Sequence, residues 1–381
     1  MRCWGSNSTG QIGLGEFANL ADDEPITTAV DLPLPPVVDI AAGAAHTCAV
    51  LDSGDLRCWG FNTSGQLGLG NTAALLSLGD DEAIDTGGPT DLSGTVAQAG
   101  LGIVQTCARV AGELRCWGGG TYGQLGLMSL ATIGDDEVPL SVDPVMLGAE
   151  PLDLAIGGAH GCALVTGGQL RCWGRADSGQ LGYANPDNIG DDEHPVSAGI
   201  VNVIPADLPP DTEIVDIGAG SEYTCALLST GQVLCWGSAE FGETGQGNVN
   251  NWGDQPGEFP AALTPIELGG VVTQIGVGFQ HSCVLLEEGD VRCWGSSSAG
   301  QVGYANEESV GDDESPADRG PVQLGAPAIG VWAGGAHSCA LLDNHEIICW
   351  GSNEFGQLGY GHTIGIGDDE VPEVAGSYSL F

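Results

Sequence analysis

The sequence predicts an all-β protein assembled from one repeated unit. The tripeptide Cys-Trp-Gly occurs seven times at intervals of 55 to 63 residues, so one supersecondary unit is built again along nearly the whole chain. The 381 residues include 64 glycines and 20 prolines, and no long segment has a helical period. Short apolar segments separated by these residues favour strands joined by turns. The repeats are centred on Trp4, Trp59, Trp117, Trp173, Trp236, Trp294 and Trp350.

Each tripeptide is predicted to lie in the second strand of a β-hairpin. Six of the seven are preceded by another cysteine in a Cys-Ala-Leu-like segment. If Cys48 lies opposite Cys58, the connecting loop is residues 52–54, with Gly54 at the third position, where a left-handed residue is required. The third repeat is one residue shorter, and its loop contains only Ala111 and Gly112, so a deletion in the turn preserves the pairing. The last hairpin, with residues 343–345 in the loop, lacks the glycine.

Cysteines opposite each other on antiparallel strands lie within bridging distance at a non-hydrogen-bonded pair. Buried free thiols in small core positions are the alternative. Metal binding is disfavoured because no CxxC spacing occurs and each pair has its own hairpin. Six disulfides indicate an oxidising location: extracellular, cell-surface or periplasmic. The predicted disulfides are Cys48–Cys58, Cys107–Cys116, Cys162–Cys172, Cys225–Cys235, Cys283–Cys293 and Cys339–Cys349.

Two further motifs accompany every hairpin and carry a family resemblance. A Gly-x-x-His-Thr segment precedes the first cysteine, as in residues 43–48, and Gly-Gln-Leu-Gly or a near copy follows the tryptophan, as in residues 65–68. Together they resemble the regulator of chromosome condensation repeat over essentially all 381 residues. The resemblance implies a single domain, 1–381, folded as a seven-bladed β-propeller of four-stranded antiparallel blades. The doubled cysteines resemble the bacterial, secreted branch of that family.

Several positions depart from the repeat. In the fifth repeat, residues 241–245 read Phe-Gly-Glu-Thr-Gly instead of Gly-Gln-Leu-Gly. The histidine position holds histidine in four repeats but Gln105 in the third and Tyr223 in the fifth. We interpret this position as a side-chain hydrogen bond inside each blade, and the repeated tryptophans as blade core. A plant ultraviolet photoreceptor of this fold uses clustered tryptophans, so light sensing is an alternative. The histidines are His46, His160, His281 and His337.

The chain begins in the second half of a hairpin, and Cys3 therefore has no hairpin partner. This accounts for the odd total of 13 cysteines. One interpretation is a fragment of a longer secreted precursor. The other is a complete chain whose seventh blade is incomplete or is closed by both termini, leaving an exposed strand edge. We favour the fragment, because an unpaired cysteine and an unpaired edge are both liabilities.

The charge is strongly acidic, with 8 basic and 51 acidic residues and a net charge of −43. No lysine occurs. Five arginines directly precede a Cys-Trp pair, and we expect them to pair with nearby carboxylates. Because no basic surface is left for phosphates, nucleic-acid binding is disfavoured. The five are Arg2, Arg57, Arg115, Arg171 and Arg292.

Acidic triads recur in six repeats, each after the glycine turn and usually before a proline, so they are expected in equivalent loops around one propeller face. Clustered carboxylate oxygens suit Ca²⁺, although the spacing differs from that of an EF-hand. Solvated loop acids that cap turns are the alternative. No other cofactor is expected. The aspartates of the candidate metal sites are Asp22, Asp23, Asp80, Asp81, Asp135, Asp136, Asp191, Asp192, Asp312, Asp313, Asp368 and Asp369.

No nucleophile–base constellation and no phosphate-binding Gly-x-x-x-x-Gly-Lys occur, so we expect no catalytic activity. The leading hypothesis is a secreted or cell-surface protein-binding scaffold, monomeric and without a membrane span. One alternative is guanine-nucleotide exchange on a small GTPase, which disulfides oppose. Another is a hydrolase or lyase acting at the central channel. Binding is expected at residues outside the repeat pattern: Tyr122, Arg175, Phe241 and Trp252, with Asn248, Asn250, Asn251, Phe61 and Phe355 as further candidates.

Overall fold

A computed structural model describes residues 1–26, 29–72 and 75–379. The chain divides into two compact units, which we describe separately. Unit 1 comprises Met1–Leu20, Thr28–Ala176 and Asp187–Ile200. Unit 2 comprises Ala21–Thr27, Asp177–Pro186 and Val201–Phe381.

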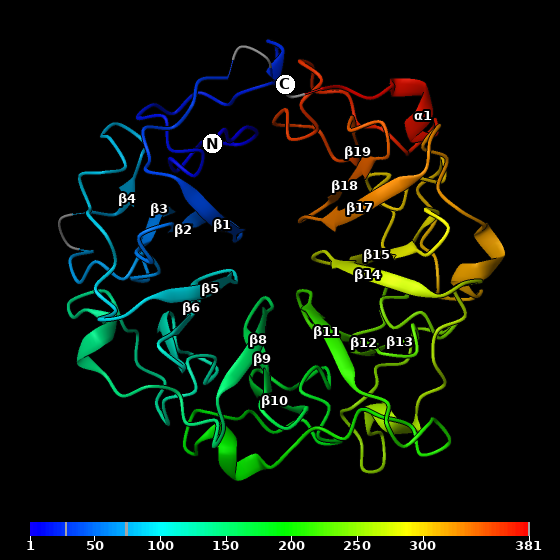
Figure 1. Cartoon of the computed structure of the whole chain (residues 1–381), viewed down its shortest axis with the longest axis horizontal. Coiled ribbons are helices and arrows are strands. Elements are labelled where there is room, and N and C mark those ends of the chain that lie inside the picture. Colours follow the sequence, from blue (N-terminus) through cyan, green and yellow to red (C-terminus); the bar gives the residue numbers. More distant parts are fainter. Residues whose placement is uncertain (27–28, 73–74, 380–381) are drawn as a thin grey trace. The chain divides into compact units, whose positions relative to one another are not determined.

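Each unit contains three antiparallel sheets of consecutive strands (Figure 1). All-β architecture is thereby confirmed. The first strands are β1 (Val37–Ala42), β5 (Val96–Leu101), β8 (Pro151–Ile156), β11 (Ile214–Ala219), β14 (Val272–Val277) and β17 (Ala328–Ala333). The second strands are β2 (His46–Leu51), β6 (Gln105–Val110), β9 (His160–Val165), β12 (Tyr223–Leu228), β15 (His281–Leu286) and β18 (His337–Leu342). The third strands are β3 (Leu56–Phe61), β7 (Glu113–Gly118), β10 (Gln169–Gly174), β13 (Val233–Gly237), β16 (Val291–Gly295) and β19 (Ile347–Gly351).

The fourth strand is much shorter than a full blade strand. In the first sheet it is β4 (Ser77–Leu78), which pairs with Gly60 and Phe61. In the other sheets it is one residue opposite the glycine of Cys-Trp-Gly. That glycine has a positive φ, as at Gly60 (102°), so the third strand turns away and the ladder ends. The single-residue bridges are Gly118–Ile133, Gly174–Ile189, Gly237–Trp252, Gly295–Val310 and Gly351–Ile366, and Gly5–Leu20 in the first repeat.

Short helical turns follow four of the acidic loops and the corresponding loop of the fifth repeat, and each begins at a proline. Proline fits this position because its φ is already helical and the first helical residue needs no N–H donor. The Ser315 hydroxyl caps one of these turns by accepting from Ala317 N. The turns are η2 (Pro139–Ser141), η3 (Pro195–Ala198), η4 (Pro260–Ala262), η5 (Pro316–Arg319) and α1 (Pro372–Ala375).

The hairpin register places every predicted cysteine pair opposite each other, and all six disulfides form as predicted, with Cα–Cα distances of 4.0 to 4.1 Å. The shorter turn of the third repeat holds Ala111 and Gly112 at φ of 52° and 82°, as a two-residue hairpin loop requires. In the last hairpin His345 takes the left-handed position at φ 67°. Cys3 is the free cysteine, and burial raises the pKa of its thiol to about 11.

The repeated tryptophans join neighbouring repeats as well as filling the sheet cores. The indole of Trp59 donates to the backbone carbonyl of Gln11, in the glycine turn of the preceding repeat, over 3.0 Å. Five other tryptophans make the same bond at 2.9 to 3.1 Å. The pairs are Trp117–Gln66, Trp173–Gln124, Trp236–Gln180, Trp294–Glu243 and Trp350–Gln301.

The histidine position also connects repeats, so the predicted bond inside each blade is wrong. His46 Nε2 lies 2.9 Å from the hydroxyl of Thr106, which belongs to the next sheet. Gln105, the replacement in the third repeat, donates to the Gly157 carbonyl of the next sheet. The side chain lies at the start of the second strand and reaches the neighbouring sheet, which a repeat considered alone does not show. Burial lowers the pKa of His46 to about 3, so its ring is neutral.

Glycine turns and acidic loops of successive repeats pack backbone against backbone. A Cβ added at Gly65 would approach the Gly134 carbonyl carbon to 2.5 Å. The same contact recurs along both units. Within unit 2, Gly356 of the last repeat packs in this way on Ala21 and Asp22 of the first. The glycine turn of the last repeat therefore packs on the acidic loop of the first repeat in the same way as in consecutive repeats.

The arginines before Cys-Trp only partly follow the carboxylate prediction. Arg2 pairs with Asp31 at 3.2 Å and Arg115 with Glu113 at 3.4 Å. Arg171 Nη1 instead donates to the Gly199 carbonyl, and Arg292 Nη1 to the Ala317 carbonyl. The last carbonyls of a helical turn are left unpaired by the turn itself, so they are natural acceptors for a cation.

Candidate functional site

The acidic triads form compact carboxylate groups. In the triads at residues 22–24, 80–82, 135–137, 191–193 and 312–314, one oxygen per residue lies within 4.8 Å of the others. Three of the six triads lie in unit 1 and three in unit 2. Burial and hydrogen bonding to neighbouring aspartates raise the pKa of Glu82, Glu193 and Glu370 to about 7, so these carboxyls retain protons near neutral pH. In these three triads a proton would compete with a cation for the glutamate oxygens.

Calcium binding by the triads stays a prediction. We expect millimolar Ca²⁺ to raise the melting temperature by several degrees relative to protein in chelator, because a cation would relieve repulsion among the carboxylates. Differential scanning calorimetry at constant ionic strength measures this. Mg²⁺ at the same concentration controls for general screening. An equal melting temperature in Ca²⁺ and chelator would contradict calcium binding.

The structure brings together two of the predicted binding residues, Tyr122 and Arg175, in unit 1. The Arg175 guanidinium carbon lies 5.3 Å from the centroid of the Tyr122 ring, a cation–π arrangement. Tyr122 belongs to the glycine turn after β7, and Arg175 directly follows β10. Tyr122 is 41 % exposed, so the pair lies at the surface.

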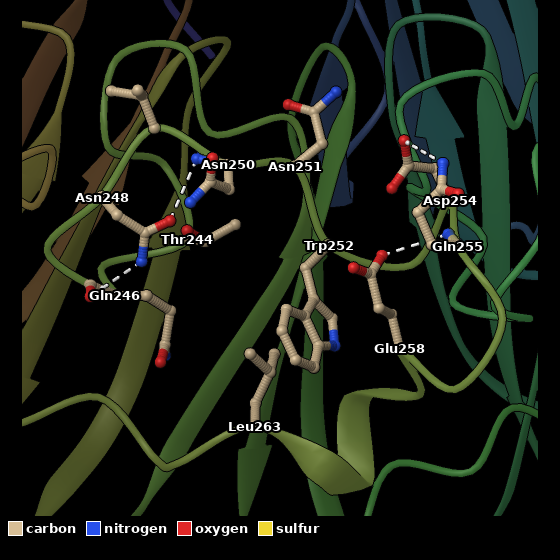
Figure 2. A pocket seen from close by; sticks show the side chains of 11 residues that line it. Thr244, Gln246, Asn248, Asn250, Asn251, Trp252, Asp254, Gln255, Glu258 and Leu263 are labelled. Atoms are coloured by element: carbon tan, nitrogen blue, oxygen red, sulfur yellow. Dashed lines mark hydrogen bonds between the residues drawn. The ribbon is translucent and has the colours of Figure 1, made fainter.

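A cavity of about 700 Å³ lies in the fifth repeat, entirely within unit 2. The segment between β13 and β14 supplies all of its lining (Figure 2). The lining residues are Thr244, Gln246, Asn248, Val249, Asn250, Asn251, Trp252, Asp254, Gln255, Glu258 and Leu263. Sequence reasoning had selected Trp252 and the three asparagines, whereas Phe241 does not line the cavity.

The cavity arises where the fifth repeat departs from the pattern. Thr244 occupies the position of the buried leucine in Gly-Gln-Leu-Gly, as at Leu181. Trp252 occupies the position of the aliphatic residue that bridges to the Cys-Trp-Gly glycine, as Ile189 does. Sequence reasoning missed Gln246, Asp254, Gln255 and Glu258 as lining residues. Aligning the seven repeats position by position identifies Gln255 as a departure, because the other repeats have the second aspartate of the acidic triad there.

Hydrogen bonds hold the lining in place. Trp252 Nε1 donates to the Phe259 carbonyl at 3.2 Å, which orients the indole. Asn248 donates through Nδ2 to the Gln246 carbonyl and accepts through Oδ1 from Asn250 N. Glu258 accepts from the backbone of Gly253 and Gln255, so this carboxylate stabilises the loop. The site is therefore formed before any ligand arrives.

Apolar side chains are exposed on the first strands of the sheets. In unit 2, β14 packs between β11 and β17. We call the exposed residues on and beside these strands the apolar strand surface: Val215, Val271, Phe279, Ile329 and Trp332. Trp332 is 54 % exposed, and its ring lies against Gly330, where a Cβ would meet the ring at 2.5 Å. The glycine thus lets the indole lie flat on its own strand.

No helix in the described part of the chain is long and apolar enough to cross a membrane.

Comparison with known proteins gives relatives of similar length and others that are far longer. The human E3 ubiquitin-protein ligase HERC2 is 27 % identical over 376 residues, which cover 95 % of this chain but only 7 % of the ligase. The ultraviolet-B receptor UVR8 of Arabidopsis thaliana is 26 % identical over 386 residues, covering 99 % of this chain and 78 % of the receptor.

Solved structures of this fold confirm the propeller architecture. Yeast RCC1 (Prp20), solved bound to Kap60, gives a TM-score of 0.73 at 20 % identity, covering 97 % of this chain and 82 % of the yeast chain. Human WBSCR16 gives 0.71 at 18 % identity, covering 97 % and 92 %. Residues 1–375 match the RCC1-like domain. That match spans all the repeats, and the chain therefore belongs to the RCC1-like domain family.

Proposed function

We propose that this chain is a secreted or cell-surface propeller that binds a protein partner and performs no catalysis. The observation that carries the proposal is the apolar strand surface, with Trp332 at 54 % exposure. Exposed tryptophan on a rigid strand is a typical anchor of protein interfaces, because it offers a large contact area and loses little conformational entropy on binding. The five exposed apolar side chains of this surface lie on or beside three neighbouring strands, β11, β14 and β17.

The charge of the chain supports a protein partner with a basic surface. A net charge of −43 attracts positively charged proteins and repels nucleic acids. One solved relative, yeast Prp20p, is described together with its binding to Gsp1p and histones. That description concerns the yeast protein. For this chain it supports only the general idea that propellers of the family bind proteins.

The six disulfides support an oxidising location, and a thiol count tests it. We expect one free thiol per chain, Cys3, when unreduced protein is denatured and titrated with a thiol reagent. A second sample is treated with a thiol-alkylating reagent before the cells are disrupted. Cysteines that are free in the cell are then alkylated and cannot form disulfides in air during purification. Thirteen titratable thiols would overturn secretion and favour the exchange-factor alternative, whose GTPase substrate is intracellular.

The partner-binding proposal is tested by Trp332→Ala. Biotinylated full-length chain is used to capture proteins from culture medium and cell surfaces, followed by quantitative mass spectrometry and binding measurements with the purified partner. We expect a partner that binds saturably to the unmodified chain and at least tenfold more weakly to the variant, the effect of losing a central tryptophan. Phe17→Ala, at a residue 58 % exposed in unit 1, is the control and should bind normally. Equal binding by wild type and Trp332→Ala would overturn this surface as the interface.

A further inference from the structure

We propose that the cavity of the fifth repeat binds a neutral saccharide. This activity is separate from the protein-binding surface, because no residue of the apolar strand surface lines the cavity. The ligand would be either a free sugar or a terminal sugar of a glycan, and both offer the same hydroxyl-rich rings.

A buried, unpartnered hydroxyl is the first reason to expect a ligand. Thr244 is 1 % exposed, and its Oγ1 has no hydrogen-bond partner among the described residues. Leaving such a buried group unpaired is unfavourable, because the hydroxyl has lost its bonds to water and gained none in return. The corresponding residues in four other repeats are leucines, so the hydroxyl is specific to this repeat: Leu67, Leu125, Leu181 and Leu358. A ligand hydroxyl in the cavity would pair with Thr244 Oγ1.

The side chains around Thr244 match the chemistry of a sugar. Amides can both donate to and accept from hydroxyl groups, and the cavity offers five of them. Figure 2 shows the amides of Gln246, Asn248 and Asn250 on one side of Trp252, and Asp254, Gln255 and Glu258 on the other. Carboxylates accept hydroxyl hydrogens, but they repel anions. The lining therefore favours a neutral polyhydroxylated ligand over a phosphate or a sialylated sugar.

The indole of Trp252 provides the apolar part of the site. Its N–H is already paired with the Phe259 carbonyl, so the ring is fixed and offers its face rather than its donor. The C–H groups on one face of a pyranose ring pack well on such a surface, because an aromatic ring is apolar and polarisable. Trp252 lies beside Leu263, which is 6 % exposed and supports the ring from the apolar side (Figure 2).

The size and accessibility of the cavity are consistent with a small ligand. Its volume of about 700 Å³ falls within the range typical of small-molecule sites, roughly 300–1,000 Å³. Val249, which is 55 % exposed, lies in its lining, so the cavity opens to the surface. A terminal sugar of a larger glycan can therefore enter without moving the backbone.

The test uses the full chain and two variants that restore the consensus of other repeats. Thr244→Leu fills the cavity and removes the unpaired hydroxyl. Trp252→Ile restores the aliphatic residue found at Ile189. Both replacements are native to this fold, so we expect melting temperatures equal to or above that of the unmodified chain. Ile364→Ala, at a residue 69 % exposed in the last repeat, is the control.

The probes are glucose, galactose, mannose, N-acetylglucosamine, cellobiose and chitobiose. Their binding is measured by saturation-transfer NMR and by tryptophan fluorescence. We expect at least one probe to bind saturably to the unmodified and control chains, and at least tenfold more weakly to both cavity variants. Glycan arrays form the second arm: binding only to immobilised glycans identifies a glycoconjugate source, and binding to free disaccharide a soluble one. Absence of saturable binding in both arms, or binding unchanged by both variants, would overturn the proposal.

Discussion

Reduction of the six disulfides is expected to unfold the protein at physiological temperature. Each disulfide closes a hairpin with a sequence separation of 9 or 10 residues, which stabilises the fold by about 2–3 kcal/mol in the chain-entropy model. Together they contribute more than about 10 kcal/mol, comparable with the whole net stability of a typical domain. We expect the cooperative transition in circular dichroism to disappear at 37 °C after reduction in mild denaturant and removal of the denaturant.

Two controls separate the disulfides from other thiol chemistry. Cys3→Ser removes the one thiol outside a disulfide and should leave the oxidised melting curve unchanged. Reoxidation of the reduced chain should restore the original transition. A reduced protein that melts within a few degrees of the oxidised one would contradict a stabilising role, and would mean that the tryptophan–carbonyl contacts between repeats suffice.

Replacing Glu243 by Gln is expected to stabilise the protein above neutral pH and to have little effect in acid. Glu243 is 1 % exposed and occupies the glutamine position of the glycine turn. Its Oε2 accepts from Phe241 N at 2.8 Å, just as Gln66 Oε1 accepts from Ser64 N. Burial raises the pKa of Glu243 to about 7. A glutamine makes the same bond without a buried charge.

The pH dependence follows from the sign of this shift. Below the ordinary pKa near 4.5, Glu243 is protonated in both the folded and the unfolded chain, so it carries no penalty. Between that value and about 7 only the unfolded chain ionises, so stability falls as pH rises, and it levels off above. We therefore expect Glu243→Gln to be about 3 kcal/mol more stable at pH 8, and nearly equal at pH 4.5.

Denaturant titrations at several pH values measure this difference. Glu82, Glu193 and Glu370 shift in the same direction, but they are present in both proteins and cancel. Glu287→Gln removes the same charge from an exposed hairpin turn and controls for net charge. A stability difference between wild type and Glu243→Gln that is the same at pH 4.5 and pH 8 would show that Glu243 does not titrate in this range.

Local features of this chain were predictable because each depends on a few neighbouring residues. The hairpin register follows from turn lengths, and it correctly paired Cys107 with Cys116 despite the missing residue. The resemblance implied a fourth strand in each blade but not its length. In five sheets the positive φ of the Cys-Trp-Gly glycine ends the ladder after one bridge. For the candidate site, Trp252 stood out as a departure from the pattern, but Glu258 did not. Its role depends on a loop that folds back on Gly253.

The sequence by itself determined the repeat, the hairpins, the disulfides and the all-β class, because each of these features arises within a single repeat. Only the tertiary structure decided how neighbouring repeats are joined. His46 reaches Thr106, and Trp59 reaches Gln11, across sequence separations that no local pattern specifies. The same holds for the cavity: a threonine and a tryptophan in place of leucine and isoleucine become a candidate binding site only where packing leaves one hydroxyl unpaired and space beside it.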